Sequence, residues 1–195
     1  MYRSLLDYLK PPPVPVEMRF NINDAAAPES FARSFYSLLN SLRTYPAQPV
    51  VIMCIGTDRS TGDALGPLIG TRLKELGFTR ASVYGTLDEP VHAANLTTFN
   101  ELILSTHPHA LIVAVDACLG RLDSVGHVLL ERGPIKPGAG VNKTLPAVGD
   151  IAVTGIVNVG GFMEHFVLQN TRLSLVKNMA YMIAAGFARG FSLSD

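Results

Sequence analysis

The chain has 195 residues, of which 48% are hydrophobic and 16% are charged, and its formal net charge at pH 7 is zero. This composition predicts a folded globular protein with a substantial core and excludes a disordered chain. The lack of net positive charge argues against a nucleic-acid-binding protein, because such proteins use a basic field to attract phosphates.

The first 48 residues are expected to form an N-terminal extension. Prolines between Pro11 and Pro15 predict an extended connector. A packing helix is expected over 29–43, since Pro28 suits a helix start and apolar residues then recur at helical spacing. The remaining residues, 49–195, are predicted to form a single α/β/α domain.

A central strand and helix are predicted from the segment that follows. The apolar run 50–55 ends at Gly56 and is typical of a buried strand. Apolar residues from Leu65 onward recur at helical spacing, with Asp63 or Gly66 as the expected cap. In an open α/β sheet such a loop faces the ligand crevice, so Asp63 is either a simple cap or a functional residue. The loop lacks the lysine and the spacing of phosphate-binding motifs.

The alternation of strands and helices continues to the end of the chain. It predicts a three-layer α/β/α sandwich with a mostly parallel sheet. The glycine- and proline-rich loop 132–149 is long enough to be functional. The further strands are expected over 81–86, 110–117, 126–131 and 150–157, and the further helices over 91–105, from 162 and over 173–187.

Two aspartates mark the predicted sheet edge. Asp116 ends an apolar strand, where it either bonds nearby loop amides or has a functional role. If the two strands are neighbours, Asp63 and Asp116 converge, the pKa of one rises, and the pair can activate a water as base and acid. Metal binding is the alternative, with His92 better placed than His127 or His165 to add the histidine that a soft divalent ion prefers.

Other polar or glycine residues in loops at the same predicted edge are candidates for substrate binding, although each could equally be an ordinary surface residue. Glu164 and Asn170 cannot be assigned a place. The candidates are Arg59, Thr86, Asp88, Glu89, His92, Arg121, Gly138, Gly140 and Lys143.

Two cysteines, Cys54 and Cys118, lie in apolar segments and are expected to be reduced thiols in a reducing compartment. The first ten residues lack the apolar region and cleavage pattern of a signal peptide. The apolar tract 179–188 is about half as long as a bilayer requires. We therefore expect a cytoplasmic protein with no membrane association.

Several long segments together resemble the YyaC family of sporulation proteins, which occurs in spore-forming bacteria. This family is similar to the spore germination protease and, in fold, to the hydrogenase maturation endopeptidases, which implies a HybD-like peptidase fold. The matching segments are CIGTDRSTGDALGP (54–67), YGTLDEPVHAAN (84–95), VDACLGR (115–121), KPGAGVNKTLP (136–146) and TGIVNVGGFMEHFVLQNTRL (154–173).

The resemblance also implies site residues. In the germination protease pattern one catalytic aspartate precedes an ALGP segment, which corresponds to Asp63, and the second precedes an alanine, which corresponds to Asp116. The glycine-rich loop of that pattern resembles residues 137–140. The maturation endopeptidases also use a later histidine to contact the nickel of their substrate. The corresponding segment here, 136–150, has no histidine, so no metal or other cofactor is expected.

Three functions remain as hypotheses. The first is an aspartate-dependent peptidase that acts on a peptide or protein, such as a spore protein, in the sporulating cell or the spore. The second is a binding protein with this fold but without catalysis. The third is a metal-dependent hydrolase of other substrates. The apolar C-terminal helix is compatible with a homodimer.

Overall fold

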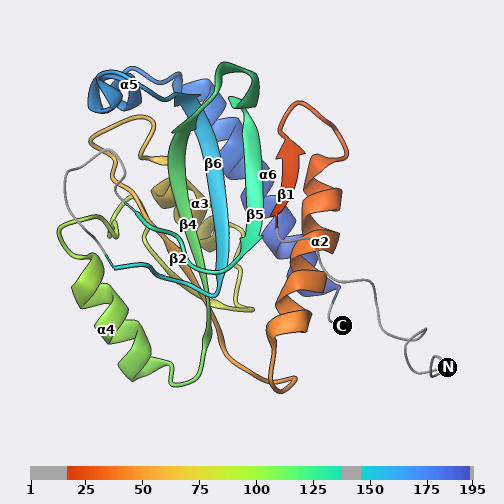
Figure 1. The fold of residues 1–195 in the computed structure, drawn as a ribbon. Coiled ribbons are helices and arrows are strands. Elements are labelled where there is room, and N and C mark those ends of the chain that lie inside the picture. The colour runs from red at the N-terminus through yellow and green to blue at the C-terminus, as the bar shows by residue number, and fades with distance from the viewer. Residues whose placement is uncertain (1–16, 138–145, 194–195) are drawn as a thin grey trace, which may run out of the picture.

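A computed structural model of the chain describes residues 17–137 and 146–193. A six-stranded sheet with the order β1-β5-β6-β4-β2-β3 forms the centre of the molecule (Figure 1). Strands β6, β4, β2 and β3 are parallel, while β5 is antiparallel to both of its neighbours. The strands are β1 (Glu17–Asn21), β2 (Val50–Cys54), β3 (Ser82–Tyr84), β4 (Leu111–Gly120), β5 (His127–Arg132) and β6 (Ile151–Val159).

Helices cover both faces of this sheet (Figure 1). Helices α2 (Ala27–Leu42), α3 (Leu65–Glu75) and α6 (Leu173–Ser192) pack on one face, and α4 (Leu96–Thr106) packs on the other. The short helix α5 (Glu164–Gln169) lies at one end of the sheet. This arrangement confirms the predicted α/β/α sandwich with a mostly parallel sheet. No helix within the described ranges is long and apolar enough to cross a membrane.

The alternation of side chains along β2 separates two cores, because successive residues of a strand point to opposite faces. Ile52 and Cys54 face the larger core beneath α2, α3 and α6, whereas Val51 and Met53 face the core beneath α4. Val51, Ile52, Met53 and Cys54 have no exposed surface, which explains the continuous apolar sequence of this strand.

Residues 17–42, which we assigned to an N-terminal extension, contribute to the same sheet and core as the rest of the chain. β1 pairs with β5, and it was not predicted because only Phe20 among its five residues is buried. The packing helix was predicted, and it is α2. Its Phe31 and Phe35 are fully buried against α6, with 4.9 Å between the ring centroids of Phe35 and Phe187.

The expected cap of α3 and the expected start of α4 were wrong. The N-cap of α3 is Ala64, and no side chain caps this helix, so neither Asp63 nor Gly66 has the capping role that we expected. Helix α4 begins at Leu96 and not near Val91, because Val91 forms a parallel bridge with Ile55 on the β2 side.

Candidate active site

Asp116 lies where two neighbouring strands part. The pairing of β2 with β4 ends at Cys54 and Val115, but β4 continues beside β6 from Asp116 to Gly120. The prediction that this strand ends at Asp116 was therefore wrong, because pairing with β6 extends it. Asp116 faces the same side of the sheet as Ala114, which packs in the core beneath α4. It thus sits in the crevice beyond the end of β2, where open α/β sheets bind ligands.

Asp63 approaches the same crevice from the loop between β2 and α3. The backbone of this loop is closed by a hydrogen bond from the Thr57 N–H to the Asp63 carbonyl oxygen, at 3.1 Å. Since the Asp63 carboxyl group does not cap α3, it is available for another role. The structure thus excludes helix capping, which the sequence had left open as a purely structural role for the Asp63 side chain.

Both aspartates line one cavity with a volume of about 580 Å³. The cavity lies among the loop between β2 and α3, the end of β4, the loop before α4, the end of β5 with the segment after it, and the helix α5. Its charged and imidazole side chains come from all of these elements. They are Arg59, Asp63, His92, Asp116, Glu131, Lys136, Glu164 and His165.

The two carboxyl groups have different environments. Burial raises the pKa of Asp116 to about 8, and the charge of Asp63 adds to the increase, while an N–H donated by Ala117 at 2.8 Å opposes it. Burial also raises the pKa of Asp63, but the Ser60 hydroxyl and the charge of His165 oppose this increase. Near neutral pH Asp116 therefore holds a proton more readily than Asp63 does. Pairs of carboxyl groups that differ in this way act as acid and base.

The raised pKa of Asp116 predicts that Asp116→Asn stabilises the protein. In the unfolded chain an aspartate ionises near pH 4, whereas folded Asp116 keeps its proton up to about pH 8. The wild type thus loses stability as the pH rises from about 4 to about 8, and an asparagine does not. Urea unfolding should show an advantage for the variant that grows from near zero at pH 4 to about 5 kcal/mol at pH 8. An advantage that is equal at both pH values would contradict the burial of an ionisable proton at this position.

The structure brings two of the candidate substrate-binding residues, Arg59 and His92, to the cavity. It does not bring Thr86, Asp88 or Glu89 there. Thr86 is only 3% exposed, and its hydroxyl accepts the Glu89 N–H at 3.1 Å. These three residues shape the turn after β3, and this turn carries His92 to the cavity.

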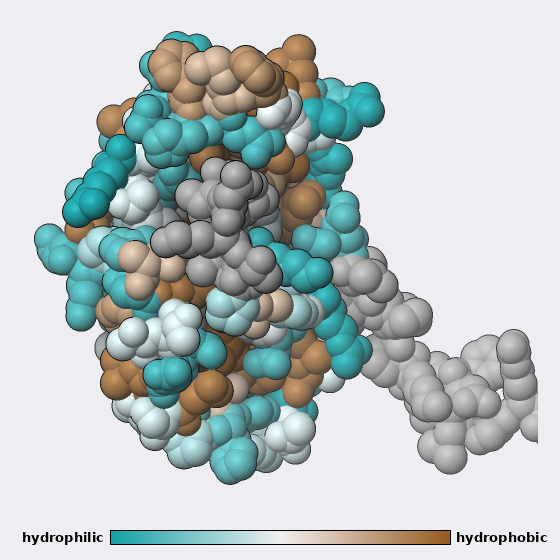
Figure 2. All heavy atoms as spheres, turned by 60° about the vertical axis from the view of Figure 1, so that its left-hand side comes forward, coloured by the Kyte–Doolittle hydropathy of each residue, from teal (hydrophilic) through white to brown (hydrophobic). Residues whose placement is uncertain are grey.

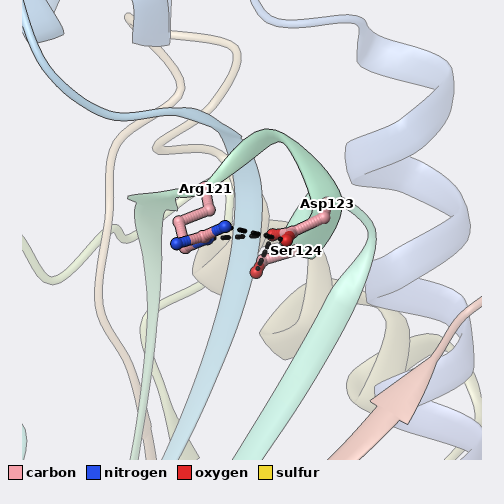
Figure 3. A network of polar contacts seen from close by, with 3 residues as sticks. All are labelled: Arg121, Asp123 and Ser124. Atoms are coloured by element: carbon pink, nitrogen blue, oxygen red, sulfur yellow. Dashed lines mark hydrogen bonds and ion pairs between the residues drawn. The ribbon is translucent and has the colours of Figure 1, made fainter.

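Arg121 also lies away from the cavity, on the exposed turn between β4 and β5. Its guanidinium group pairs with Asp123 at 3.3 Å, and the Ser124 hydroxyl donates to the same carboxylate at 3.0 Å (Figure 3). The short 3-10 helix η1 (Leu122–Ser124) forms this turn. The remaining candidates, Gly138, Gly140 and Lys143, fall outside the described residues.

The cavity contains side chains that the sequence analysis missed. Glu131, Thr154 and Cys118 project from three strands onto the face that carries Asp116. Burial raises the pKa of Cys118 to about 12, with the charges of Asp116 and Glu131 adding to it, so this thiol stays protonated. The alternation of side chains along β5 and β6 could have identified Glu131 and Thr154, had the strand order been known.

The sequence analysis considered His165 a less suitable metal ligand than His92. His165 nevertheless lines the same cavity as Asp63. Glu164, which could not be assigned from the sequence, lines it as well. Both residues belong to α5, whose position could not be derived from the sequence pattern because a helix of six residues has little periodicity.

Hydrogen bonds hold α5 against the loop that carries Asp63. The Gly62 N–H donates to the Leu168 carbonyl oxygen at 2.9 Å, and a side chain on Gly62 would press against Leu168. On the other side of α5, the Asn158 side-chain amide donates to the Thr171 hydroxyl at 3.2 Å. The helix is therefore linked to both the Asp63 loop and the end of β6.

Among the described residues, no three histidine, cysteine, aspartate or glutamate side chains converge as a metal site. The metal-dependent alternative therefore gains no support from the placement of His92 and His165. The expectation that the protein uses no cofactor stays a prediction.

Comparison with known proteins identifies the family. Residues 19–186 match the family described as "Protein of unknown function (DUF1256)". The chain belongs to this family. It is 55% identical over 173 residues to "Uncharacterized protein YyaC" of Bacillus subtilis (strain 168). The aligned residues cover 88% of this chain and 80% of that protein. The resemblance to YyaC proteins inferred from the sequence is thus confirmed.

A solved structure supports the fold. The crystal structure of the NiFe hydrogenase maturation protease HycI from Thermococcus kodakarensis KOD1 matches with a TM-score of 0.51 and 20% identity, over 74% of this chain and 93% of that chain. The predicted HybD-like peptidase fold is therefore confirmed. At this identity the likeness concerns the fold alone, because one fold can carry unrelated functions.

Proposed function

We propose that this protein is an aspartate-dependent peptidase in which Asp63 and Asp116 activate a water for peptide hydrolysis. The observation that supports the proposal most directly is that both carboxyl groups line one cavity and interact electrostatically. The position of the cavity beyond the ends of parallel strands and the peptidase-like fold also support it.

The proposed chemistry assigns a separate task to each carboxyl group. The Asp63 carboxylate accepts a proton from the water molecule. As it does so, the oxygen of that water forms a bond to the peptide carbonyl carbon. Asp116 gives its proton to the peptide nitrogen as the carbon–nitrogen bond breaks. The proton then held by Asp63 is returned to Asp116 through solvent, which restores the starting state. Hydrolysis thus proceeds without a covalent intermediate.

The biological setting of the proposal is sporulation or germination, and the proposed substrate is a peptide or a protein of the spore. This setting is inferred from the resemblance to the YyaC family, which occurs in spore-forming bacteria. We further propose that the protein acts in the cytoplasm of the sporulating cell or in the spore.

Cleavage of spore proteins provides the test of this proposal. An extract of sporulating cells would be incubated with the wild type, with the Asp63→Asn/Asp116→Asn double variant, or with Asp123→Asn. New protein N-termini would then be identified by mass spectrometry. We expect a set of N-termini made by the wild type and by Asp123→Asn, whose exposed aspartate lies on the turn of Figure 3, but absent with the double variant. The same N-termini in all three samples, or none in any, would reject the proposal.

A second function, binding of a protein partner without catalysis, is favoured by exposed apolar residues next to the cavity. Phe162 is 89% exposed, and Met163 and Phe166 are also exposed, beside the α5 residues that line the cavity. Hydrophobic residues gather at this end of the molecule, at the top of Figure 2. Exposed apolar patches of this kind mark interaction sites in many proteins.

This second function predicts that Phe162→Ser/Phe166→Ser weakens partner binding. Aromatic residues often dominate binding energy, so retention of a partner from the same extract should fall about tenfold. Leu104→Ser, on the exposed side of α4, provides the matched control with an equally polar replacement. In a quantitative pull-down, a partner lost equally from the Leu104 variant would indicate non-specific adhesion. A partner retained by Asp63→Asn and Asp116→Asn would favour binding over catalysis.

A further inference from the structure

Thr154 lies beside Asp116 on the sheet face that forms one wall of the cavity. The two residues are register partners in the parallel pair of β4 and β6, and both line the cavity. Side chains of such partners point to the same face of the sheet, and neighbouring strands lie about 4.8 Å apart. The sheet therefore holds the Thr154 side chain next to that of Asp116 without the help of a loop.

The hydroxyl group of Thr154 is available to a ligand. It forms no hydrogen bond within the described residues, and it is not among their buried atoms that lack a partner, so the cavity gives access to it. The residues before and after it on the same face of β6, Ala152 and Ile156, are apolar and buried. A valine would suit this strand as well, because both β-branched residues favour strands. The fold therefore does not need a hydroxyl group at this position.

The strand order places Thr154 and Asp63 on opposite sides of Asp116. Strand β4 lies between β2 and β6 (Figure 1). The loop that carries Asp63 leaves β2, whereas Thr154 belongs to β6. A peptide carbonyl group above Asp116 thus has Asp63 and its water on one side and the Thr154 hydroxyl on the other.

The proposed reaction needs a hydrogen-bond donor at this place. As the water oxygen bonds to the peptide carbonyl carbon, the π bond of the carbonyl group opens, and the negative charge of Asp63 passes to the carbonyl oxygen. Donors that point at such an oxyanion make a large contribution to acyl-transfer catalysis. Asp116 gives its proton to the peptide nitrogen, an ionised Glu131 only accepts hydrogen bonds, and the Cys118 thiol is a weak donor.

The other donors that line the cavity lie on the far side of β4 or are not held in place. Thr57 and Arg59 belong to the loop after β2, and the residue before His92 bridges with the end of β2. His165 belongs to α5, which is hydrogen-bonded to the same loop. Lys136 follows β5 and is thus a competing donor on the β6 side. Its side chain is exposed and forms no hydrogen bond or ion pair within the described residues.

We propose that Thr154 is a catalytic residue of this site, whose hydroxyl group donates a hydrogen bond to the carbonyl oxygen of the scissile peptide and stabilises the oxyanion. The inference rests on the proposed peptidase function and adds the group that receives the developing negative charge. Thr154 keeps its proton throughout and forms no covalent bond to the substrate.

Replacement of Thr154 tests the proposal on a peptide that spans a cleavage site found in the spore extract. Thr154→Val should lower kcat about 100-fold and change KM less than about threefold, because the hydroxyl stabilises the transition state more than the bound substrate. Thr154→Ser keeps the hydroxyl and should retain most of the activity. Thr97→Val, on the exposed side of α4, is the matched control and should leave kcat unchanged. The Tm of Thr154→Val should not decrease, since no hydrogen bond is lost.

The outcomes separate this proposal from the peptidase function. Full activity of Thr154→Val beside an inactive Asp63→Asn would reject the role of Thr154 alone. A larger loss in Lys136→Met than in Thr154→Val would assign the oxyanion to Lys136 and overturn the proposal. Equal losses in Thr154→Val and Thr154→Ser would indicate a packing role. A basic limb of the pH profile that moves in Thr154→Val, with the same plateau, would show that the hydroxyl acts on Asp116 and not on the substrate. A wild type that cleaves nothing would reject the peptidase and this proposal together.

Discussion

Asp63→Asn and Asp116→Asn are each expected to lower kcat for peptide hydrolysis by about 100- to 10,000-fold, the range that general acid or base groups contribute. The double variant should lose about as much as the more damaging single variant, because an acid and a base that act on one water work as a unit. A peptide spanning a cleavage site found in the spore extract would serve as the substrate. Losses that multiply in the double variant would contradict a shared water.

The pH profile of the wild type provides an independent check of the same mechanism. Hydrolysis requires Asp63 to be ionised and Asp116 to be protonated, so the rate should be bell-shaped. The basic limb should fall near pH 8, where the pKa of Asp116 lies. In Asp63→Asn the pKa of Asp116 should decrease, because the negative charge of Asp63 contributes to the raised pKa of Asp116. A rate that stays constant above pH 9 would exclude Asp116 as the acid.

Gly66→Ala is expected to destabilise the protein by about 3 kcal/mol, which corresponds to a decrease in Tm of about 6–12 °C. In an ordinary helix position this replacement would stabilise by about 1 kcal/mol, because alanine has the higher helix propensity. Here the added methyl group would collide with the Ile55 carbonyl oxygen, since α3 packs with its backbone directly against the end of β2.

Whether Gly66→Ala raises or lowers the stability of the protein therefore shows which of two effects is larger, the helix propensity of alanine or the collision with the Ile55 carbonyl oxygen. Thermal unfolding monitored by circular dichroism would measure it, with Lys74→Ala as a control on the exposed side of the same helix. A higher Tm for Gly66→Ala would show that helix propensity outweighs the backbone contact. If the variant folds, it should also lose activity, because displacement of α3 moves the adjoining Asp63 loop.

Much of the fold was predictable because it depends on local apolar patterns. The buried run of β2 and the helical spacing of α2, α3 and α6 are visible in the sequence. Each of these patterns predicts the ends of its strand or helix to within a few residues. β1 was missed because it has one buried residue and is stabilised by pairing with β5, more than 100 positions later. The length of β4 was underestimated because β6 supports its last residues.

The candidate site was predictable only in part. Asp63 and Asp116 follow apolar runs directly, so each could be placed at the sheet edge from its own segment. His165, Glu131 and Thr154 could not, because their positions depend on the strand order and on the attachment of α5. Thr86 was assigned to the site from its loop, but the loop turns back on itself and buries the side chain.

The packing of α2 against α6 affects how the chain folds during synthesis. Phe31 and Phe35 of the second element are covered by Phe187 and Phe191 of the last helix. Until residues 173–192 have left the ribosome, these rings lack their native cover, and a nascent chain in this state is prone to aggregation. Domains otherwise begin to fold from the N-terminus as they emerge. For this protein the folded core, and with it the cavity that Asp63 and Asp116 line, is completed only after α6 has emerged.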